Sequence, residues 1–206
     1  MEKDRIVSKL KQARGINTKE KIVEAAERYF CENGYYEATI RKLADAAGVS
    51  IGSFYFYFKN MDDLLLEVSR RQNERFLHTI GASLAKTDCY KADRREWLRG
   101  FILDLLNTYG NSGKLRVELR ALNYEKPKIA CQKKMQNDQA IKLMMDSIGS
   151  SLMMNDLKVT HPQIALLFVI DMVDSTYDRI AGGNPAQRSE DIIDECVDAV
   201  YKYLFL

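Results

Sequence analysis

The hydrophobic positions of this chain repeat with helical spacing over most of its length. In residues 18–33, Ile22, Ala25, Ala26, Tyr29 and Phe30 stand at positions i, i+3, i+4, i+7 and i+8, which places them on one face of a helix. No stretch alternates with the two-residue period of a strand. The pattern predicts an all-α fold of about nine helices, at about 18–33, 40–47, 51–57, 60–86, 93–110, 114–125, 127–154, 161–181 and 188–205.

Capping residues mark the ends of the first three predicted helices. Thr18, Thr39 and Ser50 stand at expected starts, where a hydroxyl can accept a hydrogen bond from a backbone N–H of the first turn. Gly34 and Gly48 stand just past expected ends, where glycine adopts the left-handed conformation most readily. The second and third helices are therefore short and joined by a tight turn.

The third predicted helix lies in an unusual stretch, "GVSIGSFYFYF", from Gly48 to Phe58. Phe54 and Phe58 are four residues apart, so both can enter the same small core. Gly52 and Ser53 lie on another side, where they present almost no side chain. This combination predicts an anchored helix with one bare side. The expected core partners are Ile22, Ala26, Phe30, Leu43 and Val49.

Two short helices joined by a tight turn, with small and polar residues on the second, are typical of a helix-turn-helix. The second helix of such a pair fits a DNA major groove about 12 Å wide, and the first crosses the backbone. Most short helical pairs only pack together. The bare side next to the tyrosine hydroxyls favours the DNA-binding interpretation.

The segment "TIRKLADAAGVSIGSFYFYFKNMDDLLLEV" resembles the DNA-binding signature of the tetracycline-repressor (TetR) family of bacterial regulators, and "KIVEAAERYFCENGYYEAT" before it fits the same pattern. The resemblance covers about residues 16–68. It implies a three-helix, helix-turn-helix DNA-binding domain over residues 1–60. It also implies a larger helical bundle domain over residues 61–206, which binds an effector and dimerises.

The same resemblance implies which residues meet the DNA. Thr39 matches a position where a hydroxyl and a backbone N–H meet a phosphate, and Arg41 matches one that reads a guanine edge in some members. A solvated Arg41, or one on a phosphate, is the alternative. Tyr55 and Tyr57 match positions whose hydroxyls contact phosphates. The remaining expected DNA-binding residues are Ser50, Ile51, Gly52, Ser53, Phe56 and Lys59.

Three residues depart from the family pattern. Ile51 stands where a polar or basic side chain often reads bases, and it can offer only apolar contact. Phe56 stands where a larger polar ring is common, and it cannot donate a hydrogen bond. Met61 stands where the family often has a lysine. We expect other cations to supply part of the missing charge: Lys59, Lys11, Arg14 and Lys19.

One such domain makes few phosphate contacts, and non-specific binding is only on the order of 10⁻⁴–10⁻⁶ M. We therefore expect a homodimer that binds a double-stranded, palindromic operator with its recognition helices about 34–36 Å apart. The predicted helix at about 161–181 is apolar nearly all round, which indicates burial on more than one side, and the helix at about 188–205 adds further apolar positions. The pattern alone leaves burial within one chain open. The resemblance implies that the two helices pair across the dimer as a four-helix bundle.

The resemblance also implies a small, often hydrophobic effector bound in the central region, where it releases the protein from DNA. Aromatic and methionine side chains there suit an irregular apolar pocket, although the same residues could simply be core. Asp104, Glu118, Asp171 and Asp174 could meet a cationic effector or could be solvated. The expected effector-binding residues are Trp97, Phe101, Leu105, Tyr109, Leu122, Met144, Phe168 and Met172.

Composition narrows the remaining alternatives. Residues 1–60 hold 11 Lys and Arg against 8 Asp and Glu, and residues 61–206 hold 20 against 21, so the basic excess lies at the front. Four scattered cysteines, two distant histidines and the absence of a GxSxG or phosphate-binding glycine motif predict no enzyme, metal site or cofactor. No signal peptide or membrane-length apolar run is present, so we expect a cytoplasmic protein. The alternative function is a helical protein-interaction module without DNA binding.

Overall fold

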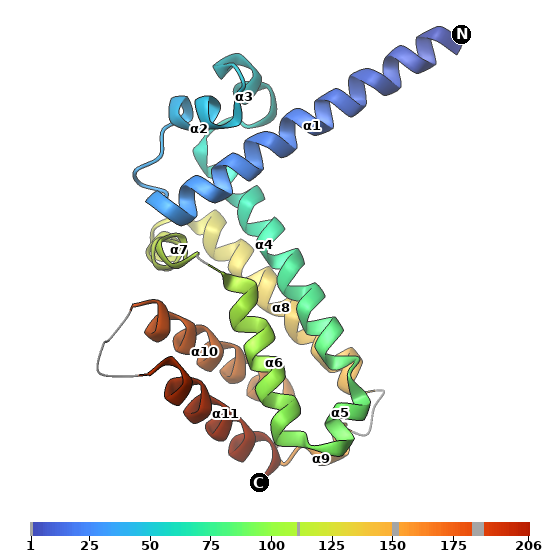
Figure 1. Cartoon of the computed structure of the whole chain (residues 1–206), viewed down its shortest axis with the longest axis vertical. Coiled ribbons are helices and arrows are strands. Elements are labelled where there is room, and N and C mark those ends of the chain that lie inside the picture. Colours follow the sequence, from blue (N-terminus) through green and yellow to red (C-terminus); the bar gives the residue numbers. More distant parts are fainter. Residues whose placement is uncertain (1, 111, 150–152, 183–187) are drawn as a thin grey trace. The chain divides into compact units, whose positions relative to one another are not determined.

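The computed structural model describes the backbone of residues 2–110, 112–149, 153–182 and 188–206, and the side chains of these ranges from residue 17 onward. The described residues form eleven α-helices and no strand (Figure 1). The helices are α1 (Glu2–Asn33), α2 (Ile40–Ala47), α3 (Ile51–Tyr57), α4 (Met61–Leu84), α5 (Thr87–Ala92), α6 (Arg94–Tyr109), α7 (Gly113–Glu125), α8 (Pro127–Gly149), α9 (Met153–Asp156), α10 (Pro162–Ala181) and α11 (Ser189–Phe205).

Nine of these helices lie where the sequence predicts them, and the all-α prediction is confirmed. The prediction that Thr18 caps the first helix is wrong, because α1 begins at Glu2. Residues 2–17 contain three Lys and two Arg, which favour helix, and they carry Ile6, Leu10 and Ala13 at helical spacing. The sequence also did not predict the short helices α5 and α9. Residues 150–152, at the end of the predicted helix 127–154, lie outside the described residues.

The chain groups into two compact units. Unit 1 contains residues 1–71 together with residues 114–122, and unit 2 contains residues 72–113 and 123–206. The segment 114–122 of α7 therefore belongs with α1, α2, α3 and the first part of α4, which no local sequence pattern indicates. The division into a DNA-binding domain over residues 1–60 and an effector-binding domain over residues 61–206 stays a prediction.

The core of unit 1 is small and mostly aliphatic. α1 contacts both α2 and α3, and α2 contacts α3. The predicted core residues are buried except Val49, which is half-buried. The fully buried side chains of this unit with the largest volumes are Phe30, Phe54, Ile22, Leu43, Leu64, Leu65, Leu115, Leu122 and Val68.

A carboxylate from α7 binds the backbone just after α1. Gly34 ends that helix with a φ of +92°, and the N–H groups of Tyr35 and Tyr36 both point at Glu118, the second at 3.4 Å. A Cβ on Gly34 would collide with the same carboxylate. Glu118 is thus a structural ligand of the α1–α2 turn, and this contact explains why its part of α7 groups with unit 1.

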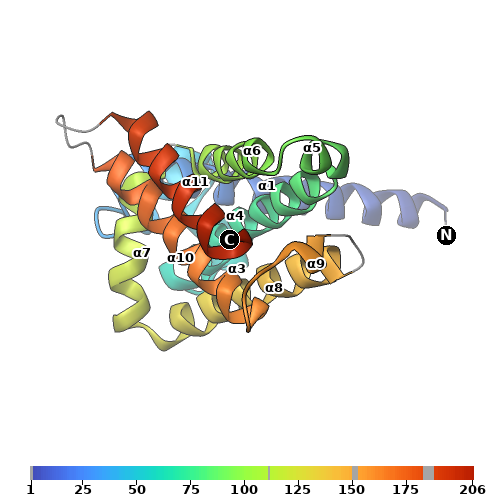
Figure 2. The same ribbon diagram turned by 90° about the horizontal axis from the view of Figure 1, so that it is seen from below.

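Unit 2 is a bundle around one large apolar cluster, to which α4, α5, α6, α8, α9, α10 and α11 contribute. α10 and α11 run side by side, and α11 also contacts α6 (Figures 1 and 2). Two ion pairs follow the α6–α11 contact, Arg95 with Asp198 at 2.5 Å and Arg99 with Asp194 at 3.1 Å. The cluster, not these exposed pairs, supplies most of the stability of this unit.

An ion-pair network in unit 1 links α1 to α4. The Glu67 carboxylate accepts hydrogen bonds from Arg70 at 3.0 Å and from the Lys19 ammonium at 2.8 Å. The hydrogen bond from Arg70, followed by that from Lys19, lowers the pKa of Glu67 from 4.5 to about 2. Because only the ionised form accepts both cations, the network is complete at neutral pH.

We predict that Glu67→Gln lowers the free energy of unfolding by about 1 kcal/mol at pH 7. The folded-state pKa of Glu67 lies below its unfolded value, so its contribution is present above about pH 4.5 and is lost as the pH falls toward about 2. Urea denaturation of both proteins across this range should show their difference shrinking with acidity. Glu190→Gln, at an exposed pair with Arg188, is the control and should change little. A difference that is independent of pH would contradict the assignment.

Candidate nucleic-acid interface

α2 has the two ends that the sequence predicts. The Thr39 side chain accepts a hydrogen bond from the backbone N–H of Lys42 at 3.2 Å. Gly48 ends the helix with a φ of +64°, and the N–H of Val49 donates to the carbonyl of Ala44 at 3.0 Å. The left-handed glycine turns the chain sharply, so α3 starts three residues later.

Ser50 begins α3. Its hydroxyl oxygen accepts from the backbone N–H of Ser53 at 3.1 Å, and the two serine hydroxyls share a hydrogen bond of 2.9 Å. The Ser50 hydroxyl therefore caps the helix, and the Ser53 hydroxyl is bonded to it. This arrangement reduces what either serine can offer to a base edge.

The side chains of α3 fall into four rows along the helix, since residues four apart lie one above the other. Phe54 and Phe58 form the buried row, with ring centroids 5.9 Å apart. Ser53 and Tyr57 form a half-buried row beside it. The two remaining rows are exposed: Ile51 with Tyr55, and Gly52 with Phe56.

The bare side that the sequence predicts is exposed only in part, because Gly52 lies in an exposed row and Ser53 in the half-buried one. A Cβ added at Gly52 would meet only the Ser50 hydroxyl oxygen, at 3.7 Å, so the backbone there is open to approach. Ile51, Tyr55 and Phe56 are 46%, 54% and 80% exposed. The bare side is therefore not sealed against the interior of the chain.

The structure places the expected cations in different settings. Arg41 and Lys59 are exposed, as is Lys42, which the sequence did not single out. The Lys42 ammonium donates to the carbonyl of Glu37 at 2.9 Å and lies over the Tyr29 ring. Lys19, expected to supply charge to DNA, pairs with Glu67 instead. The side chains of Lys11 and Arg14 lie outside the described residues.

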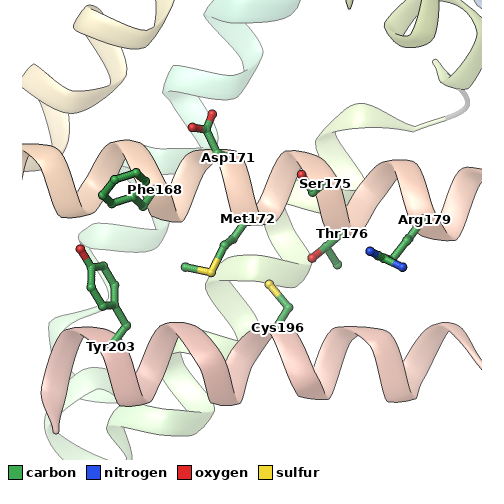
Figure 3. Close-up of a pocket in the computed structure, with 8 residues that line it drawn as sticks. All are labelled: Phe168, Asp171, Met172, Ser175, Thr176, Arg179, Cys196 and Tyr203. Atoms are coloured by element: carbon green, nitrogen blue, oxygen red, sulfur yellow. The ribbon is translucent and has the colours of Figure 1, made fainter.

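A second surface feature lies along α10 and α11. An open groove of about 690 Å³ runs between these helices (Figure 3). Cys196 and Tyr203 come from α11, and the other side chains of the groove come from α10. The lining residues are Phe168, Asp171, Met172, Ser175, Thr176, Arg179, Cys196 and Tyr203.

The eight residues expected to bind effector fall into three places. Trp97, Phe101, Leu105 and Met144 are buried in the cluster of unit 2, and Tyr109 packs at its margin. Phe168, which is 54% exposed, and Met172 line the open groove instead. Leu122 is buried in unit 1.

Polar groups accompany the cluster of unit 2. The Tyr109 hydroxyl donates to buried Asp174 at 2.6 Å, and the Lys133 ammonium lies 3.3 Å from the other oxygen of that carboxylate. The Tyr177 hydroxyl donates to the carbonyl of Gly110 at 2.6 Å. Asp104 is bound by Ser83 and Lys86, and the hydrogen bond from Lys86 is the main cause of its lowered pKa.

Within the part of the chain that the structure describes, no three His, Cys, Asp or Glu side chains gather as a metal site would require. Over the same residues, no helix combines the length and the apolar character that crossing a membrane requires.

Residues 22–68 match the model of a family described as bacterial regulatory proteins, tetR family. A fatty acid metabolism regulator protein of Bacillus subtilis is 36% identical over 59 residues, which are 29% of this chain and 30% of that protein. An HTH-type transcriptional repressor of Mycobacterium tuberculosis is 26% identical over 84% of this chain and 87% of its own length. The regulator of Bacillus subtilis and the next curated relative are matched over only about a third of their own length.

Solved structures of TetR regulators share the fold of this chain. The crystal structure of a TetR transcription regulator from Haloarcula marismortui superposes with a TM-score of 0.71 at 19% identity, over 90% of this chain and 95% of that one. At this identity the likeness shows the fold. Residues 22–68 thus match the TetR family of bacterial regulatory proteins, and the described residues have the fold of a solved TetR regulator.

Proposed function

We propose that this protein is a transcriptional repressor that binds a palindromic operator as a homodimer and is released by a small hydrophobic effector. It acts in the cytoplasm by binding, not by catalysis. The main support for this proposal is the arrangement of α3. Its buried Phe54 and Phe58 hold two rows exposed, and one of these rows contains the open backbone of Gly52. Such a surface suits close approach to the major groove.

The DNA contacts follow from this orientation. Thr39 and the N-terminus of α2 meet a phosphate, because the first N–H groups of a helix attract anions. Arg41 is exposed on α2 and has the bidentate geometry that suits a guanine edge. Tyr55 and Tyr57 hydroxyls and the Lys59 ammonium bind phosphates. Lys42 is a further phosphate ligand that would leave the Glu37 carbonyl to reach DNA.

We place the effector in unit 2, against Trp97, Phe101, Leu105, Tyr109 and Met144. Aromatic and methionine side chains can rearrange around an apolar ligand. Trp97 is held in position, since its ring N–H donates to the carbonyl of Ser83 at 3.2 Å. To release the operator, the effector must favour the DNA-incompetent dimer by about 1–3 kcal/mol or more.

We assign Phe168 and Met172 to the dimer interface, together with the rest of the groove on α10 and α11. Asp171, Ser175 and Arg179 are exposed at intervals of four on α10. Ser175 lies midway, about 6 Å along the axis from each charge. A two-fold axis at Ser175 brings Asp171 of one protomer against Arg179 of the other, twice, which makes the surface self-complementary.

The test of the function is the affinity of the intact protein for DNA upstream of its own gene. Fluorescence anisotropy at 50 and 200 mM salt should show specific binding that weakens by about 10³-fold or more, as six or more phosphate contacts require. An affinity independent of salt and sequence would instead favour the helical protein-interaction module.

We predict that Gly52→Ala separates stability from DNA binding. Alanine in a helix is favoured over glycine by about 0.5–1 kcal/mol, and nothing crowds this position, so the variant should be at least as stable in urea. Its methyl group should keep α3 from the base edges and weaken operator binding at least ten-fold. Gly100→Ala, in α6 with open space around it, is the matched control. Full DNA affinity of Gly52→Ala would contradict the proposed docking.

We predict that charge reversal on α10 controls assembly. Asp171→Arg and Arg179→Asp should each shift the sedimenting mass from twice 23.7 kDa toward the monomer, because like charges then face each other. The double variant should dimerise again. Asp138→Arg, an exposed change on α8, should remain a dimer. Dimers of unchanged stability in both single variants would rule out the two-fold axis at Ser175.

A further inference from the structure

The exposed rows of α3 contain almost no hydrogen-bonding side chain. Of their four residues, Ile51 and Phe56 are apolar, Gly52 has no side chain, and only Tyr55 carries a polar atom. The hydroxyls of Ser50 and Ser53, which flank these rows, bond to each other at 2.9 Å, and that of Ser50 also caps the helix. A recognition helix built in this way has few means of distinguishing bases by hydrogen bonds.

Ile51 and Phe56 nevertheless lie on the exposed rows of α3, which the proposed docking turns toward the bases. Ile51 is the first residue of α3, and Phe56 stands above Gly52 on the neighbouring exposed row. Phe56 is 80% exposed, and the Tyr57 ring meets it only at an edge, with ring centroids 4.9 Å apart at 84°. Leaving a phenyl ring in water is unfavourable unless another surface covers it.

Only one group in the major groove rewards apolar contact, and that is the C5-methyl of thymine. We propose that Ile51 and Phe56 read thymine methyl groups, so that α3 selects operator bases by apolar contact while Arg41 on α2 supplies the hydrogen-bonded contact. This inference depends on the proposed DNA binding and specifies its base preference. Each half-site then carries at least two thymines whose methyls face α3.

The test replaces thymine by deoxyuridine, which pairs identically and lacks the methyl. The intact protein is first used to select a binding duplex from random DNA. Each thymine of that duplex is then replaced singly and in symmetric pairs. Two positions of each half-site should respond. At each of them, losing one buried methyl should weaken binding about four-fold, and losing the symmetric pair about fifteen-fold. Replacements outside the bound region are the control and should have no effect.

Protein variants assign each methyl to its side chain. Ile51→Ala should abolish the deoxyuridine effect at one position and Phe56→Ala at the other, as a double-mutant cycle detects. Arg41→Ala and Tyr55→Phe should weaken binding to the thymine duplex and to its deoxyuridine counterpart by the same factor. Phe56 is so exposed that its replacement should not impair folding, which urea denaturation checks.

The outcomes separate the two proposals. If the protein selects a duplex but every deoxyuridine replacement changes affinity by less than 1.5-fold, methyl reading is overturned and DNA binding stands. If it selects no duplex at either salt concentration, DNA binding itself fails, and methyl reading with it. A deoxyuridine effect that survives both alanine variants also overturns the assignment.

Discussion

The burial of Phe54 and Phe58 is the constraint on which the rest of the interface depends. α3 has only seven residues, and a helix of that length is not stable in water on its own. Its conformation and its rotation about its axis are therefore set by the two rings in the core of unit 1. Once this row is fixed inward, helical geometry alone places Ile51, Gly52, Tyr55 and Phe56 outward. An anchor that shifted by one residue would turn a different set of side chains to the DNA.

The supporting contacts around this anchor are spread along the sequence. Gly48 positions the start of α3, the Glu67 network ties α4 to α1, and Glu118 holds the turn that follows α1. Each contact contributes modestly to stability, and together they fix how α1, α2, α3 and the start of α4 pack in unit 1. The stability of the interface thus depends on residues that do not touch the exposed rows.

Local chemistry made much of this structure predictable. The caps at Thr39 and Ser50, the glycine at position 48 and the buried spacing of Phe54 and Phe58 all act within a few residues, so sequence alone identified them. The long start of α1 was not predicted because Thr18, a good capping residue that lies inside the helix, was taken as its beginning. Apolar periodicity also could not tell that Phe168 lies on an open groove while Trp97 lies in a core, since both suit a buried face. Glu118 escaped because its partner backbone is more than eighty residues away.

Protection of DNA from methylation by dimethyl sulfate tests the central claim most directly, because the reagent attacks guanine N7 in the major groove and adenine N3 in the minor groove. If the Phe54 and Phe58 anchor turns α3 toward the major groove, the bound protein should protect guanine N7 in two clusters about one helical turn apart, and should leave adenine N3 between them reactive. Protection confined to adenine N3, or none at either groove, would contradict the account.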